Sequence, residues 1–223
     1  MTNTALDTIE IETAPNPTVS VIWLHGLGAD GNDFVPIVHE LDLMDCPPIR
    51  FVFPHAPTMP VTINNGYVMR AWYDILGADL VRREDEAGLR KSQTLVEDLI
   101  AREKSRGIPS ARIVLAGFSQ GCAMTLQTGL RHPEKLAGLL GLSGYLPIHT
   151  TLPSERHSAN YDTPIFLAHG GSDPIIPIDR AERSRDILQS LGYDVEWHEY
   201  RMPHSVCAEE IDDVSAWLKR VLA

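Results

Sequence analysis

The stretch Gly117-Phe118-Ser119-Gln120-Gly121 decides the fold expected for this chain of 223 residues. It follows the apolar run 112–116 and precedes a helix-like segment over 122–131. A strand that turns sharply into a helix lifts the middle side chain clear of the sheet, and the two glycines remove the Cβ atoms that would obstruct the turn. The pattern predicts that the Ser119 hydroxyl stands at a helix N-terminus, where free N–H groups favour negative charge. A glycine-rich turn with an idle serine is the alternative, so Ser119 needs partners elsewhere in the chain.

Composition favours one globular domain spanning residues 1–223. Hydrophobic residues make up 43% of the chain and charged residues 22%, which is ordinary for a folded domain of this length. The formal net charge of -11 repels phosphate backbones and anionic lipid headgroups, so we expect no nucleic-acid partner. The longest mostly apolar stretch, 136–142, is too short to span a bilayer, so we expect no integral membrane association.

Targeting and metal signals are weak. Residues 1–12 show neither a positive cluster nor an apolar core, so we expect no signal peptide and a cytoplasmic protein. The cysteines, Cys46, Cys122 and Cys207, are odd in number and spaced unlike a zinc motif. Reduced thiols fit this pattern, and we expect no metal site.

Apolar strand patterns alternate with amphipathic helix patterns along the chain. Predicted strands cover 19–24, 49–53, 112–116, 136–143, 164–169 and 194–200, and predicted helices cover 34–41, 84–106, 122–131, 178–191 and 211–221. Asn32 or Asp33 is the expected cap of the first helix. This alternation predicts an α/β fold with a mostly parallel, twisted sheet and helices on both faces. Ligands in such sheets bind beyond the carboxyl ends of the strands.

Two connections lack any regular period. The segment 55–85 holds several prolines and an Asn65-Gly66 turn signal, and so long a loop in a compact domain is usually functional. Its apolar side chains are candidates to bind substrate, with closure of one end of the core as the alternative. These candidates are Trp72, Tyr73, Ile75 and Leu76. The segment 145–164 is polar and proline-bearing, which predicts a surface connection at the rim of the site.

Three residues with complementary chemistry each follow the carboxyl end of a predicted strand: Ser119, Asp173 and His204. The rule for open sheets therefore places them on one edge. Their order along the chain is that of an α/β-hydrolase triad. A neutral hydroxyl is a poor nucleophile, so His204 would remove the proton of Ser119 while Asp173 holds the imidazole in one tautomer.

An acyl-transfer reaction also needs donors for the developing oxyanion. We expect the backbone N–H of Gln120, directly after the nucleophile, and one from the glycine-rich loop 25–31, with Leu27 favoured. His25 precedes those glycines, which favours a structural role for it.

Other residues compete for the triad roles. His169 also ends a strand but precedes the turn that carries Asp173, while His198 lies inside a strand. Asp162 precedes its strand, and Asp179 begins a helix, where an aspartate is usually a cap. His204 and Asp173 remain the favoured pair.

Several separated motifs together resemble the bacterial carboxylesterases related to acyl-protein thioesterases, within the α/β-hydrolase superfamily. The motifs are HGLGADG (25–31), FPHAP (53–57), MRAWYD (69–74), GFSQG (117–121), GSDPIIP (171–177) and HSV (204–206). The resemblance covers nearly the whole chain. It implies an α/β-hydrolase without a large cap domain and without a cofactor, acting on small or lipid-like esters and thioesters. It also implies the same triad, with Leu27 and Gln120 as oxyanion donors.

Pro203 departs from the family pattern, which usually has glycine before the histidine. Proline fixes φ and removes an N–H, so it constrains the loop that carries His204. Three functions stay open: a serine carboxylesterase working through an acyl-enzyme, an acyl-protein thioesterase or lysophospholipase, and a hydrolase-fold protein that binds a ligand without turning it over. The sequence fits a monomer or a homodimer.

Overall fold

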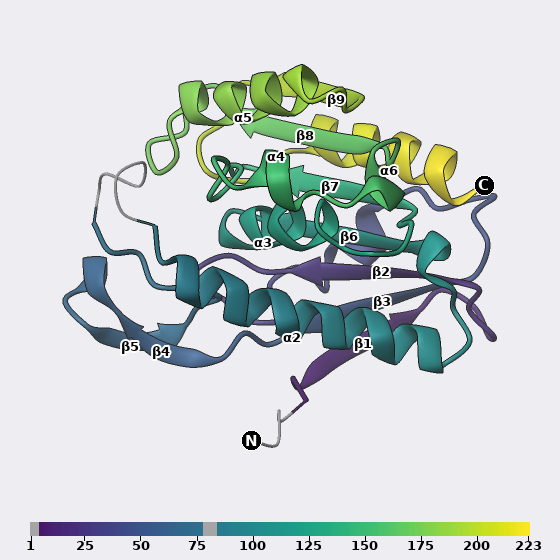
Figure 1. Cartoon of the computed structure of the whole chain (residues 1–223). Coiled ribbons are helices and arrows are strands. Elements are labelled where there is room, and N and C mark those ends of the chain that lie inside the picture. The colour runs from purple at the N-terminus through teal and green to yellow at the C-terminus, as the bar shows by residue number, and fades with distance from the viewer. Residues whose placement is uncertain (1–4, 78–83) are drawn as a thin grey trace.

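A seven-stranded sheet forms the centre of the computed structural model, which describes residues 5–77 and 84–223 (Figure 1). Its strands are β1 (Thr8–Glu12), β2 (Val19–Leu24), β3 (Ile49–Pro54), β6 (Ile113–Phe118), β7 (Gly138–Leu142), β8 (Ile165–Gly170) and β9 (Val195–Tyr200). They lie in the order β1-β3-β2-β6-β7-β8-β9, and only the β1–β3 pair is antiparallel among these seven. The predicted mostly parallel sheet is confirmed.

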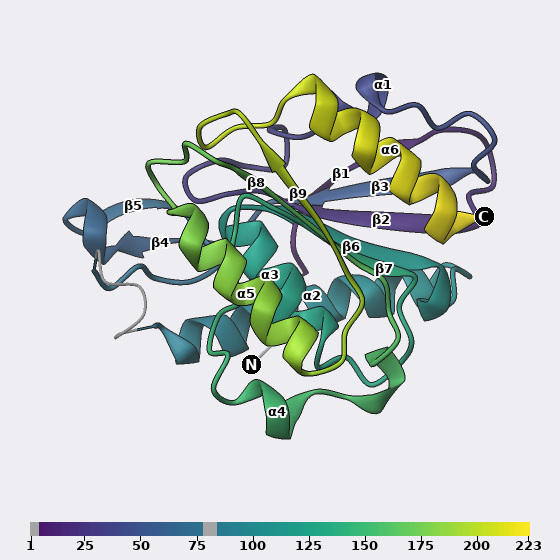
Figure 2. The ribbon, with the colours of Figure 1, turned by 90° about the horizontal axis from the view of Figure 1, so that it is seen from above.

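Helices cover both faces of this sheet (Figure 2). One face carries α2 (Glu86–Ser105), α3 (Gln120–Gly129) and α5 (Ile178–Ser190), and the other carries α1 (Ile37–Glu40) and α6 (Ala208–Leu222). Short helical turns lie in the connections: η1 (Thr62–Asn64), η2 (Ser110–Arg112), α4 (Leu152–Glu155) and η3 (Ser158–Asn160). Within the described ranges, no helix has the length and apolarity needed to cross a bilayer.

Two hydrophobic cores result, one on each face of the sheet. Alternate residues of β2 enter opposite cores: Ile22 and Leu24 pack beneath α2 and α3, while Val21 and Trp23 pack beneath α1 and α6. Successive side chains of a strand point to opposite faces, so a strand covered on both sides needs apolar residues at every position. This requirement is the physical reason for the continuous apolar runs in the sequence.

The first helix is shorter than predicted. A helix over 34–41 with Asn32 or Asp33 as cap was expected, but α1 is one turn that begins after Pro36. Before it, Val35 N–H donates to Asn32 O at 3.2 Å, and further turns with the same spacing follow. Pro36 cannot donate a helical hydrogen bond, so the chain closes tighter i to i+3 turns instead.

In the part of the chain that the structure describes, three strands lie outside the predicted ones. β1 is an edge strand whose partner, β3, is 38 or more residues away along the chain. The hairpin of β4 (Thr58–Val61) and β5 (Tyr67–Arg70) occupies the segment predicted to be aperiodic, with Asn65 (φ 55°) and Gly66 (φ 76°) in its turn. The turn prediction is confirmed, but each strand is only four residues long and largely exposed, which is too short for a clear alternation.

The prediction that 145–164 is a surface connection is wrong for the first residues of the segment. Tyr145, Leu146 and Ile148 are each at most 6% exposed. They pack with the core between the sheet and α5 because the chain crosses that end of the sheet before reaching the surface. Two predicted segments, 1–12 and 55–85, include residues 1–4 and 78–83, which lie outside the described residues.

Candidate active site

The connection from β6 to α3 forms a strained turn at Ser119. Its φ of 56° and ψ of -116° are rare for a residue with a side chain. A Cβ atom on Gly121 would lie 2.0 Å from the backbone oxygen of Leu24, and one on Gly117 would lie 2.3 Å from the backbone of Gly121. Only glycine fits at both positions, since the start of α3 packs directly against the end of β2. This close packing holds Ser119 at the carboxyl edge of the sheet.

Ser119, His204 and Asp173 lie in one hydrogen-bonded series. The Ser119 hydroxyl lies 3.0 Å from His204 Nε2, and His204 Nδ1 lies 2.6 Å from Asp173 Oδ2. The Asp173 side chain is fully buried, and that of His204 is 16% exposed. A carboxylate at Nδ1 fixes the tautomer that carries its proton there, leaving Nε2 free to accept the proton of the hydroxyl.

The carboxylate of Asp173 is held from its other side. Its Oδ1 accepts the backbone N–H groups of Ile175 and Ile176 at 2.8 and 2.9 Å. The loop after β8 is also fastened to the loop after β9, because Ser172 N–H donates to Met202 O at 3.2 Å. Asp173 and His204 therefore sit on two loops that are tied to each other.

Pro203 does not turn His204 away from its partners. The ring of Phe118 packs on the His204 imidazole with 4.8 Å between centroids. A Cβ on Gly170 would lie 2.4 Å from the backbone oxygens of Met202 and Pro203, so the loop before His204 rests on the end of β8. His204 therefore keeps both of its partners, Asp173 and Ser119, in a loop that contains Pro203.

Leu27 and Gln120 flank Ser119 in one cavity. Gln120 is the first residue of α3, so its backbone N–H has no acceptor within the helix. A Cβ on Gly26 would lie 3.3 Å from Ser119 Cβ, which brings the chain next to Leu27 close to the hydroxyl. Both predicted oxyanion residues thus lie beside the nucleophile.

The cavity that contains Ser119 and His204 has a volume of about 550 Å³. Most of its other lining is apolar, including Ile63, Ile75, Phe118, Pro174, Ile175 and Ile176. Tyr73 and Tyr145 also line it, and their hydroxyls lie 2.8 Å apart. Burial raises the pKa of Tyr73 well above its ordinary value, so this hydroxyl stays neutral and polar.

The four predicted substrate residues separate into two groups. Tyr73 and Ile75 line the cavity, but Trp72 and Leu76 are not among its lining residues. Trp72 is fully buried, and its indole N–H donates to the backbone oxygen of His25 at 2.9 Å. For Trp72, the alternative interpretation, closing an end of the core, describes the structure better.

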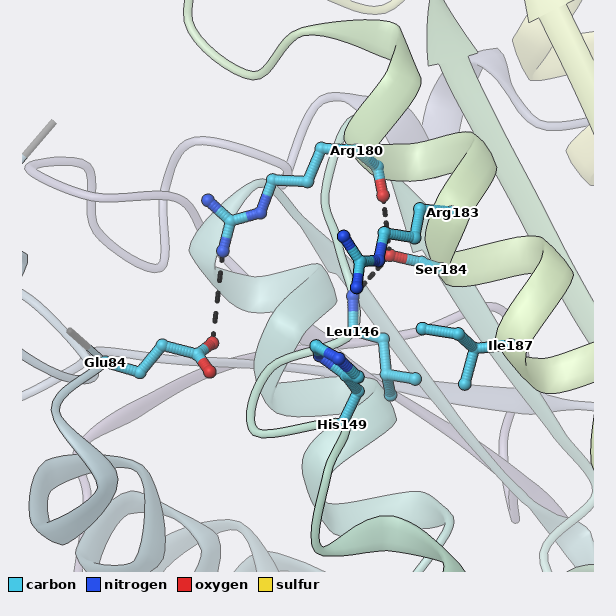
Figure 3. A pocket seen from close by; sticks show the side chains of 7 residues that line it. All are labelled: Glu84, Leu146, His149, Arg180, Arg183, Ser184 and Ile187. Atoms are coloured by element: carbon cyan, nitrogen blue, oxygen red, sulfur yellow. Dashed lines mark hydrogen bonds and ion pairs between the residues drawn. The ribbon is translucent and has the colours of Figure 1, made fainter. Parts of the chain in front are cut away.

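Tyr145 is a cavity residue that the sequence analysis missed. It lies three residues after the end of β7, and the apolar side chains of Tyr-Leu-Pro-Ile at 145–148 were the available signal. Behind it, the Arg180 guanidinium lies 3.4 Å from the centre of the Tyr145 ring and 3.9 Å from a Glu84 oxygen. Figure 3 shows this ion pair beside a second cavity of only about 30 Å³, where Ser184 Oγ accepts the backbone N–H of Leu146. These contacts fasten the Tyr145 segment to α5.

The competing residues are engaged elsewhere. His198 pairs with Glu196, and Asp162 pairs with Lys135. Asp179 lies in the first turn of α5. His25 is buried; its Nδ1–H donates to Gly26 O at 2.7 Å and its Nε2 accepts from Ala56 N–H at 3.0 Å, which is a structural role. Burial lowers its pKa and keeps it neutral.

His169 lies behind Asp173. Its Nε2–H donates to Ile176 O at 2.8 Å and lies 3.3 Å from Asp173 Oδ2. Burial lowers the pKa of His169, and its side chain has no exposed surface. It therefore supports the loop that carries Asp173 and does not reach Ser119.

A mostly parallel sheet with a strained serine turn at its carboxyl edge, and with an aspartate and a histidine on the loops after β8 and β9, defines an α/β-hydrolase of the serine hydrolase class. The chain belongs to the phospholipase/carboxylesterase family, whose model matches residues 7–222. It is an enzyme that hydrolyses carboxylic esters or thioesters.

Relatives of known name agree with this family. The chain is 42% identical to acyl-protein thioesterase 1 of Yarrowia lipolytica over 207 residues, covering 91% of each chain, and 42% identical to that of Gibberella zeae, covering 94% and 93%. Among solved structures it is similar to Arabidopsis thaliana SOBER1, with a TM-score of 0.86, 30% identity and coverage of 92% and 99%. These relatives are fungal and plant proteins, so they do not support the bacterial part of the expected resemblance.

Proposed function

We propose that the protein is a serine carboxylesterase and thioesterase that works through an acyl-enzyme on Ser119, with His204 as general base and Asp173 as its partner. The observation that supports this most strongly is the unbroken series of contacts from Asp173 to His204 at 2.6 Å and from His204 to Ser119 at 3.0 Å. In that arrangement the hydroxyl can lose its proton as it attacks.

The proposed reaction has two halves. Ser119 Oγ attacks the carbonyl carbon while its proton moves to His204 Nε2, and the carbonyl oxygen takes up the negative charge. The N–H groups of Leu27 and Gln120 are the proposed donors to that oxygen. When the intermediate collapses, the alcohol or thiol leaves with the proton from His204. Water then attacks the acyl-enzyme by the same route and releases the acid.

The cavity favours an acyl group with apolar character. Its lining supplies aliphatic and aromatic surface near the nucleophile, with Tyr73 and Ile75 as proposed substrate contacts. The fungal relatives are named acyl-protein thioesterases, which supports thioesters as one substrate class. We propose no substrate contact for Trp72 or Leu76.

Replacement of the nucleophile tests the proposal. Ser119→Ala should lower kcat for a nitrophenyl ester by roughly 10³- to 10⁶-fold. Ser143→Ala is a matched control, because Ser143 is also buried, also has a positive φ and directly follows the neighbouring strand β7. Its Oγ has no hydrogen-bond partner within the described residues. Unchanged turnover in Ser119→Ala would refute the proposal.

A fluorophosphonate probe separates an enzyme from a ligand-binding protein. The wild type and Ser143→Ala should be labelled stoichiometrically at Ser119, and Ser119→Ala should not. Binding of an ester without turnover or labelling would support the ligand-binding alternative. A chain-length series of oxyesters, thioesters and lysophospholipids, compared by kcat/KM, would then identify the preferred substrate class.

A further inference from the structure

Trp72 contacts both strand-to-helix connections of the candidate site. Its indole Nε1–H donates to His25 O at 2.9 Å, two residues before Leu27. Its backbone N–H donates to the side-chain oxygen of Gln120 at 2.9 Å. One residue of the 55–85 segment therefore contacts the chain at or beside both proposed oxyanion donors.

The side chain of Gln120 is held from two directions. Besides accepting from Trp72, its Nε2 donates to Tyr73 O at 2.7 Å. Ser92 of α2 donates its hydroxyl to Trp72 O, which ties the same peptide to a long helix. An amide with both of its groups paired in a buried site has one orientation, and it fixes the start of α3 relative to residues 72–73.

The loop with Leu27 is held at both ends by the same segment. His25 O accepts from Trp72, and Gly28 N–H donates to Arg70 O at 2.9 Å. Leu27 lies between these two anchors. Gly28 has a φ of 78°, so the chain reverses sharply there and needs external contacts to keep its direction.

We propose that Trp72 is a positioning residue for the oxyanion hole: its indole holds the His25 carbonyl, and its peptide holds the Gln120 side chain, so that both donor N–H groups point to one place. This inference rests on the proposed function. Hydrogen-bond donors stabilise an oxyanion only at close range and in the right direction, so a small displacement of the 25–28 loop weakens the transition state more than the bound substrate.

Trp72→Phe removes the indole N–H and keeps an aromatic ring. Trp23→Phe is the matched control, because Trp23 is 1% exposed, lies two residues before His25 and has an indole N–H without a partner in the described part of the chain. We expect Trp72→Phe to lower kcat by about 10- to 100-fold with KM within about 3-fold, and Trp23→Phe to change kcat by less than about 3-fold.

Inhibition by a trifluoromethyl ketone, compared with its secondary alcohol, separates a weaker oxyanion hole from a general loss of stability. Ser119 adds to its carbonyl carbon, the proton passes to His204, and the carbonyl oxygen becomes an oxyanion. The corresponding secondary alcohol fills the cavity without forming one. In Trp72→Phe, the inhibition constant of the ketone should rise by the same factor as kcat/KM falls, while that of the alcohol stays within about 3-fold.

A second variant acts through the other contact. Gln120→Met keeps the backbone N–H but removes both side-chain hydrogen bonds, and should weaken the ketone without weakening the alcohol. Equal weakening of ketone and alcohol in both variants, or a kcat for Trp72→Phe equal to that of Trp23→Phe, would overturn the inference. Failure of the proposed function looks different: the wild type itself would not turn over esters, and the ketone would bind equally well to Ser119→Ala.

Discussion

Two connections in this molecule share one sequence pattern, an apolar strand followed by glycines and a helix, yet they fold differently. The β6–α3 connection turns within the single residue Ser119 and continues into a ten-residue helix. The β2–α1 connection takes twelve residues, from 25 to 36, and ends in a one-turn helix. The first connection carries Ser119, the proposed nucleophile, whereas the second carries Leu27, a proposed oxyanion donor.

The difference lies in what holds each turn. The sharp turn of the β6–α3 connection at Ser119, called the elbow below, is fixed by direct backbone packing, since Gly121 lies against Leu24 with no room for a Cβ. The 25–28 part of the other connection is fixed by two hydrogen bonds to a distant segment: Gly28 N–H donates to Arg70 O, and the Trp72 indole N–H donates to His25 O. A turn held by packing tolerates no added atom, while a turn held by hydrogen bonds depends on its partners.

Gly121→Ala tests the packed turn and should have the largest effect on folding. The new Cβ would lie 2.0 Å from Leu24 O, a backbone atom that cannot move aside without displacing β2. We expect a loss of about 3 kcal/mol or more in the free energy of unfolding, measured by urea denaturation. A loss below about 1 kcal/mol would show that the elbow is not packed as described.

Gly28→Ala tests the hydrogen-bonded turn. Its φ is 78°, but among the described residues a Cβ there meets only Met69 Sδ at 3.5 Å, so the cost is conformational and about 1 kcal/mol. Gly107→Ala is the control, because Gly107 has a φ of 95°, lies after α2 away from the site, and has no atom of the described ranges within 4 Å of an added Cβ. Both should lose similar stability, and only Gly28→Ala should lower kcat. Equal activity in the two variants would argue against a role for the 25–28 loop.

Leu27→Ala tests whether the 25–28 loop acts through a backbone N–H, in contrast to Ser119, which acts through its side chain. Because the proposed role of Leu27 uses its backbone N–H, truncating its side chain should lower kcat by roughly 5-fold or less, against the far larger loss in Ser119→Ala. KM should rise, since the side chain lines the cavity. A kcat loss comparable to that of Ser119→Ala would mean that the side chain itself, or the loop conformation, controls the reaction.

The reactivity of the Cys122 thiol tests the packing behind the elbow without any substitution, and its expected effect is the smallest. Its thiol packs against Gly141 and Gly144, and burial raises its pKa to about 12. At pH 8 only about one thiol in 10⁴ is then ionised, so iodoacetamide should not modify Cys122 in the native protein. The pKa of Cys122 is higher in the folded protein than the ordinary value of about 9 in the unfolded chain. Burial of the neutral thiol therefore does not lower stability below about pH 9. Stability falls as pH rises from 9 towards 12, because the thiol ionises in the unfolded chain first.

Peptide mapping after alkylation measures this reactivity. The partly exposed Cys46 and Cys207 are the internal comparison, and the urea-unfolded chain should be modified at all three cysteines. Native modification of Cys122 at the rate of Cys207 would contradict the close packing behind the elbow.

The sequence by itself determined the parallel sheet, the sharp turn at Ser119, and the order along the chain of the proposed triad, Ser119, Asp173 and His204. These features leave local marks, because strands buried on both faces need continuous apolar runs and a sharp turn needs glycines at fixed spacing.

Tertiary structure decided the rest: which aromatic residue lines the cavity and which one holds a loop, the entry of Tyr145 into the site, the single turn of α1, and the pairing of β1 and of the β4–β5 hairpin. The contact between Trp72 and His25 joins residues 47 positions apart. A side chain's partner at that distance depends on how the whole chain packs, and no local pattern of residues encodes it.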